Sequence, residues 1–175
     1  LSIEELARSA FKTGGTISVS ESVNATNAAP SCCVNIIDVD IDRETGKVDV
    51  TKVTVFQDAG RAIHPDFVEG QMQGGVAQGI GWALNEEYIY DNEGKVMNPG
   101  FLDYRMPLFN DLPMIDTVII EVPNPHHPYG VRGVGEAPIC APMAAVAIAV
   151  NRALGTNIRE MPMRPSRVMS AIMGK

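Results

Sequence analysis

Cysteine is scarce in this sequence, and basic residues are outnumbered by acidic ones. The only cysteines are Cys32, Cys33 and Cys140. They form no Cys-x-x-Cys pair and adjacent cysteines rarely bridge, so we expect reduced thiols in a cytoplasmic protein and no iron–sulfur motif on this chain. With 14 basic and 21 acidic residues, the formal net charge is −7. This charge disfavours nucleic acid as a partner.

A long apolar run, a signal peptide and an initiator Met are also lacking. The most apolar stretch, Ile139 to Val150, is flanked by Glu136 and Arg152. It is shorter than a transmembrane helix requires, so we expect no membrane partner. The chain begins at Leu1, which suggests a processed or truncated product. Its 175 residues suffice to bury a hydrophobic core.

Periodicity and turn signals predict an α+β domain. Helices are expected over Ser2 to Lys12, Asp66 to about Glu86, Pro138 to about Leu154, and from near Pro165 onward. Strands are expected over Val34 to Ile41, Lys47 to Gln57, Glu87 to Tyr90 and Asp116 to Val122. The first two strands should pair as a hairpin. Ser2 and Glu5 predict a capping box, and Gly155 predicts a helix C-cap.

The helix expected over residues 66–86 is rich in glycine. It contains Gly70, Gly74, Gly75, Gly79 and Gly81. A glycine inside a helix costs up to about 1 kcal/mol relative to alanine, so something must compensate. Either another helix packs closely, or a ligand approaches the bare backbone. Gln71 and Gln78 share one helix face; they could contact a heterocyclic cofactor or simply lie in solvent.

A second glycine-rich segment, Gly130 to Pro138, places Glu136 just before a helix. One interpretation is structural, because a helix N-terminus favours negative charge. The other is a general base held on a loop. In the same segment, Arg132 could pair with a cofactor phosphate or with Glu136, or be solvated. His126 and His127 have no third ligand at a recognisable spacing, so we expect no metal site there.

These two segments resemble the molybdopterin-binding subunit of the xanthine dehydrogenase/aldehyde oxidase family. Gly133-Val134-Gly135-Glu136-Ala137-Pro138 resembles the C-terminal signature of that subunit, and Glu69 to Gly81 resembles its glycine-rich helix. Asp58-Ala59-Gly60-Arg61 also fits, and the resemblance covers nearly all of residues 1–175. It implies the C-terminal part of the molybdopterin-binding domain, with strands packed against the glycine-rich helix and a C-terminal apolar helix.

The resemblance also implies a cofactor and residue roles. Glu136 would be the catalytic base in the oxidative hydroxylation of an aldehyde or an N-heterocycle such as a purine, with water as the oxygen source. Molybdopterin, with or without a cytosine dinucleotide extension, would be contacted by Gln71, Gly70, Arg132, Gly133, Val134 and Gly135. One departure is His64, where relatives often have Asn before the proline, and this affects the helix cap only.

The family's molybdopterin part is several times longer than this chain. The expected partners are therefore the rest of that subunit and the iron–sulfur and flavin subunits, which would carry the clusters and FAD, together with a small-molecule substrate. We expect the isolated chain to be inactive, because an active site shared between lobes cannot work when one lobe is missing. The alternative is a non-catalytic structural or assembly module that kept the fold.

Overall fold

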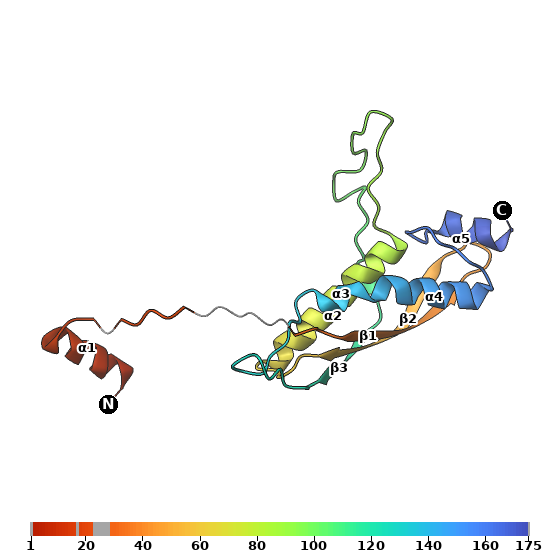
Figure 1. Cartoon of the computed structure of the whole chain (residues 1–175). Coiled ribbons are helices and arrows are strands. Elements are labelled where there is room, and N and C mark those ends of the chain that lie inside the picture. The colour runs from red at the N-terminus through yellow and green to blue at the C-terminus, as the bar shows by residue number, and fades with distance from the viewer. Residues whose placement is uncertain (1, 17, 23–28, 175) are drawn as a thin grey trace.

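Three strands and five α-helices make up the computed structural model, which describes residues 2–16, 18–22 and 29–174 (Figure 1). The strands form one sheet in the order β1 (Cys33–Ile41), β2 (Val48–Asp58), β3 (Ile115–Ile120). The first two strands form the predicted antiparallel hairpin. The pair β2 and β3 is parallel, because α2 (Pro65–Leu84) and a long loop carry the chain back between them. The α+β prediction is confirmed.

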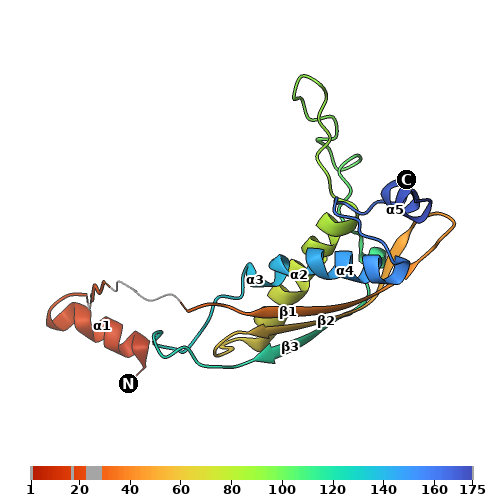
Figure 2. The same cartoon turned by 45° about the vertical axis from the view of Figure 1, so that its right-hand side comes forward.

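Helices cover one face of this sheet. Both α2 and α4 (Pro142–Leu154) pack on the face that carries the buried Ile37, Val53 and Val55 (Figures 1 and 2). The core is completed from the helices by Met72, Val76, Ile80, Val146 and Val150. The opposite face of the sheet exposes Val34, Ile36, Val118 and Ile120. The sheet is therefore buried on one side only.

The helix ends follow local sequence signals. Helix α1 (Ile3–Thr13) begins with the predicted capping box, in which Ser2 Oγ accepts from the Glu5 amide at 3.2 Å. His64 caps α2, because its Nδ1 accepts from the Phe67 amide at 3.4 Å and its ring stacks on that of Phe67. Helix α4 ends at the predicted Gly155, at a φ of 67°. The last helix, α5, spans Pro165–Ile172.

Two predictions about elements are wrong. Residues 87–90 form no strand, and only an isolated bridge joins Tyr90 to Val96. The helix expected from Pro138 is two helices, α3 (Ala137–Cys140) and α4. The break falls at Ala141, because Pro142 has no N–H with which to continue the helix.

One apolar stretch also corrects an expectation. Among the described residues, Ala137–Leu154 is long and apolar enough to cross a membrane by length and composition. Val146 and Val150 within it are completely buried in the core. The stretch therefore fits core helices of a packed domain.

A long arm, residues 85–114, projects from the body between α2 and β3 (Figure 1). Its base is held by Asn98, which accepts from the Ile89 amide at 2.9 Å and donates to the Glu87 carbonyl at 2.6 Å. The arm contains the short 3-10 helix η1 (Phe109–Asp111). Its most exposed apolar side chains are Phe101, Leu102 and Phe109.

Candidate functional site

The two glycine-rich segments face one another across a pocket of about 630 Å³. Helix α2 lines it with Gln71, Gly74, Gly75, Gln78 and Trp82. The opposite wall consists of Gly135, Glu136, Ile139 and Cys140. Gln71, Gly135 and Glu136 are all exposed, so the pocket opens to solvent. The structure thus brings three of the predicted site residues together.

Close helix packing explains two of the helix glycines, and a third lies bare in the open pocket, where a ligand contact stays a prediction. A Cβ at Gly75 would lie 2.8 Å from Pro138 Cβ, and one at Gly79 would lie 2.9 Å from Pro142 Cβ. These two glycines allow α3 and α4 to pack closely on α2. A Cβ at Gly74 would meet no atom within 4 Å, so its backbone faces the open pocket.

Glu136 occupies the N-cap position of α3, yet its side chain makes no capping hydrogen bond. The carboxylate is therefore not used to begin the helix. Next to it, a Cβ at Gly135 would lie 3.7 Å from Gln71 Nε2. A larger residue at position 135 would narrow the space between Gln71 and Glu136. Glycine keeps that space open.

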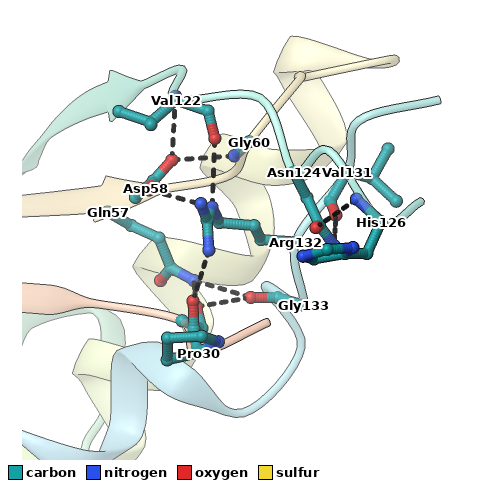
Figure 3. A network of polar contacts seen from close by, with 11 residues as sticks. Pro30, Gln57, Asp58, Gly60, Val122, Asn124, His126, Val131, Arg132 and Gly133 are labelled. Carbon is teal, nitrogen blue, oxygen red and sulfur yellow. Dashed lines mark hydrogen bonds and ion pairs between the residues drawn. The ribbon is translucent and has the colours of Figure 1, made fainter. Parts of the chain in front are cut away.

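Arg132 is an internal tie between chain segments. Its Nε lies 3.1 Å from Asp58 Oδ2, and the two side chains are only 13% and 16% exposed. The same Nε donates to the Val122 carbonyl at 3.0 Å, and Nη1 donates to the Pro30 carbonyl at 2.9 Å (Figure 3). The pairing with Glu136 left open by the sequence is not formed, because Asp58 is the partner. A cofactor contact by Arg132 stays a prediction.

The Gly133 carbonyl is also held from within the chain. It accepts from Ser31 Oγ at 2.7 Å and from Gln57 Nε2 at 3.1 Å. Gln57 is completely buried and also donates to Ser31 Oγ at 3.1 Å. The predicted role of Gly133 beside a cofactor is untested, but its backbone oxygen serves to anchor the loop.

Val134 and Gly70 lie outside the main pocket. Val134 packs against the core and lines a smaller hollow of about 240 Å³ together with Gln71 and Arg132. Gly70 lines a different pocket of about 620 Å³, formed with arm residues such as Phe109 and Met114 and with Ile115 of β3. The structure therefore does not bring Gly70 to Glu136.

The sequence named Gln78 as a possible cofactor contact, because it shares a helix face with Gln71, but it missed two other lining residues. Ile139 and Cys140 had no sequence signal, because they reach the pocket only through the packing of α3 on α2. Within the described residues, no group of three or more His, Cys, Asp or Glu side chains could hold a metal ion.

The cysteines Cys32, Cys33 and Cys140 are free thiols in the structure. Burial raises the pKa of the Cys33 thiol, and a hydrogen bond from Asn35 offsets part of this effect. Cys140 is exposed in the pocket wall, where its Sγ lies 3.6 Å from the Glu136 carbonyl oxygen. Cys140 is thus the one cysteine among the residues that line this pocket.

The chemistry of the pocket fits a flat, polar heterocycle. Gln71 and Gln78 each offer an amide donor and an acceptor, and Trp82 offers an aromatic surface. Bare backbone at Gly74 and Gly135 allows close approach. Glu136 is the one carboxylate among the lining residues. Within the part of the chain that the structure describes, Glu136 is therefore the carboxylate that could accept a proton in this pocket.

Comparison with known proteins places these features in a family. The model of the molybdopterin cofactor-binding domain matches residues 1–113. A xanthine dehydrogenase molybdenum-binding subunit of Escherichia coli is 37% identical over 172 residues, covering 96% of this chain and 23% of the relative. An aldehyde oxidoreductase of Megalodesulfovibrio gigas is 33% identical over 141 residues, covering 79% of this chain and 15% of the relative.

Solved structures agree. The crystal structure of quinoline 2-oxidoreductase from Pseudomonas putida superposes with a TM-score of 0.74 at 38% identity, over 77% of this chain and 18% of that chain. The aldehyde oxidoreductase from Desulfovibrio gigas gives a TM-score of 0.76 at 31% identity, over 82% of this chain and 15% of that chain. This chain thus spans less than a quarter of the length of these relatives.

Proposed function

Because the chain belongs to the molybdopterin-binding subunits of the xanthine dehydrogenase/aldehyde oxidase family, we propose that residues 1–175 are the C-terminal cofactor-binding lobe of a molybdenum hydroxylase. The reaction is the oxidative hydroxylation of an aldehyde or an N-heterocycle such as a purine, with water as the oxygen source. The supporting observation is the meeting of Gln71, Gly135 and Glu136 in one open pocket.

In this proposal the chain binds and orients the cofactor and supplies a proton acceptor. When bound, the molybdenum cofactor supplies the oxygen-transfer and two-electron chemistry. The Gln71 and Gln78 amides hold and orient the pterin by donating and accepting hydrogen bonds. The Glu136 carboxylate takes a proton from the oxygen nucleophile, and no capping hydrogen bond engages its oxygens.

The same proposal defines the partners. The rest of the molybdopterin subunit completes the pocket, which this chain walls on two sides only, and the relatives' greater length supports this. Iron–sulfur clusters and FAD lie on partner domains or subunits, and the complex works in the cytoplasm. The isolated chain has no hydroxylase activity, because one lobe holds only part of the site.

Replacing Glu136 by Gln in the assembled enzyme tests the proposal. Glutamine keeps the shape of the side chain but accepts no proton at neutral pH. We expect kcat to fall by roughly 10²- to 10⁴-fold, the usual contribution of a general base, while the molybdenum and pterin contents stay unchanged. Steady-state kinetics and metal analysis check this.

The matched control is Glu44→Gln, the same change in the exposed turn between β1 and β2. Its kinetics should equal those of the unchanged enzyme. Full activity of Glu136→Gln would contradict the base assignment. It would favour the view that this lobe is a structural or assembly module.

A further inference from the structure

Four consecutive residues at the end of β2 hold the loop that carries Glu136. These residues are Gln57, Asp58, Ala59 and Gly60, and each contacts residues 130–133 of the loop. Figure 3 shows the contacts of Gln57 with Gly133 and of Asp58 with Arg132. We propose that this four-residue group, the β2 seat, positions the Glu136 carboxylate in the pocket. The inference rests on the proposed role of Glu136 as base. It assigns the seat residues a positioning role and no contact with substrate.

The backbone of the seat pairs directly with the loop. The Ala59 carbonyl accepts from the Arg132 amide at 2.9 Å, and the Ala59 amide donates to the Ile120 carbonyl at 2.9 Å. Gly60 has a φ of +69°, and a Cβ there would collide with the Gly130 carbonyl oxygen. Only glycine allows the loop to lie this close to the seat.

Asp58 ties three segments together with one carboxylate. Its Oδ1 accepts from the Gly60 amide at 2.9 Å and from the Val122 amide at 3.1 Å, while Oδ2 pairs with Arg132. This pair is mostly buried, so water competes for it weakly. Loss of either partner would leave a poorly solvated charge, which costs more than loss of a surface pair. The ends of β2 and β3 and the loop are thus joined at one point.

Gln57 is polar at a position where an apolar side chain would fit the core. It is completely buried, and its Oε1 has no hydrogen-bond partner within the part of the chain that the structure describes. A buried oxygen without a partner lowers stability, so a leucine here would avoid that cost. Glutamine instead donates a hydrogen bond from Nε2 to the Gly133 carbonyl, which fixes the position of the loop. The choice of glutamine is explained if that position matters to function.

Two anchors therefore enclose Glu136. On one side Gly133 is held by the seat, and Val134 packs against the core. On the other side Pro138 packs on Gly75 of α2. Only residues 135–137 lie between the two anchors. Reacting groups must be placed to within about 1 Å for full rate, so two fixed ends this close suit a positioned base.

NMR order parameters of the isolated chain test the seat without any cofactor. Gln57→Leu removes the hydrogen bond to the Gly133 carbonyl and also removes the side-chain oxygen that has no partner. We expect the order parameters of the Gly135 and Glu136 amides to fall from about 0.85 toward about 0.6. The midpoint of urea unfolding should stay the same or rise. A merely structural role predicts the opposite, namely a lower midpoint with no change confined to the loop.

Asp58→Asn is the second variant, since it removes the charge that pairs with Arg132 and keeps the shape. We expect the same fall in the order parameters of residues 135–136, while the order parameters of the Val53 and Val55 amides stay unchanged. Asp116→Asn, an identical change at an exposed position of β3, is the matched control and should leave the order parameters of both regions unchanged. Unchanged order parameters in both seat variants would overturn the positioning role, whatever the enzyme's activity.

The assembled enzyme separates this inference from the proposed function. With Gln57→Leu we expect kcat to fall by roughly tenfold or more with KM little changed, because a misplaced base affects the chemical step. If Glu136→Gln is fully active, the base assignment fails, while loss of loop order in the seat variants would still support the seat. If Glu136→Gln is inactive and Gln57→Leu keeps full activity and order, the seat inference fails alone.

Discussion

Tyr104 shows how the arm controls the acid–base behaviour of a single side chain. Burial, followed by the hydrogen bond to Glu86, raises its pKa to about 12. Its hydroxyl donates to Glu86 Oε2 at 2.8 Å. The folded chain thus favours the protonated phenol. The resulting stabilisation is complete below the unfolded pKa of about 10 and is lost as the pH rises toward 12.

Tyr104→Phe should remove this dependence. At neutral pH we expect a loss of about 0.5–1.5 kcal/mol in the free energy of unfolding, because one hydrogen bond is removed. Between pH 10 and 12 the variant should lose less stability than the unchanged chain. Urea unfolding across this range measures both effects. The exposed Tyr129→Phe serves as control, and an identical alkaline profile for Tyr104→Phe would contradict the assignment.

Individual site residues differ in how far the sequence predicts them. The resemblance placed Gln71 and Glu136 in one site, and the pocket contains both. The partner of Arg132 could not be predicted, because Asp58 lies at the end of β2, far from the Arg132 loop in the sequence, and no spacing rule joins the two. The burial of Gln57 Oε1 without a described hydrogen-bond partner could not be predicted either, because burial of a polar residue depends on tertiary packing. Residue type suggests chemistry, whereas contacts between distant segments decide its use.

The glycine helix α2 offers a matched pair of substitutions. Gly75→Ala places a Cβ 2.8 Å from Pro138 Cβ, so α3 must move off α2. We expect a loss of about 1–3 kcal/mol in the free energy of unfolding, as for other overpacked sites. Gly74→Ala meets no atom within 4 Å and should gain up to about 1 kcal/mol from helix propensity. Thermal and urea unfolding of both variants check the opposite signs; two changes of the same sign would contradict this packing.

The sequence predicts secondary-structure elements correctly where the signal lies within a few neighbouring residues. The hairpin of β1 and β2 and the cap at Gly155 follow from alternation and a turn residue, and both are confirmed. The strand expected over residues 87–90 is wrong, because a strand needs a neighbouring strand and the arm provides only one bridge. The break before Pro142 was missed because the apolar pattern runs through it unchanged. The parallel pairing of β2 and β3 carries no local signal at all.

At the scale of the whole molecule, the arm between α2 and β3 projects from the body and exposes apolar side chains (Figure 1). Phe101, Leu102 and Phe109 are the most exposed of them. Apolar side chains gathered on one exposed segment are typical of an interaction surface.

Apolar side chains of the arm should therefore serve association and contribute little to stability. Phe101 and Leu102 are 89% and 95% exposed. Replacing both by Ser should change the free energy of unfolding by less than about 0.5 kcal/mol. Light scattering should show less self-association of the isolated chain. Asp103→Ser in the same arm is the control, and a large loss of stability in the double variant would show that the arm packs on the body.

The parallel pairing of β2 with β3 also sets an order of folding. The hairpin of β1 and β2 closes a short turn, whereas β3 can join only after residues 59–114 have been spanned. Contacts between distant segments form slowly, because closing a long loop costs chain entropy. The Glu136 loop follows β3 in the chain and is anchored to the β2 seat and to α2, so we expect it to be among the last parts to take its place. We therefore expect a newly made chain to pass through a stage in which α2 has formed its wall of the pocket and the wall that carries Glu136 is not yet in place.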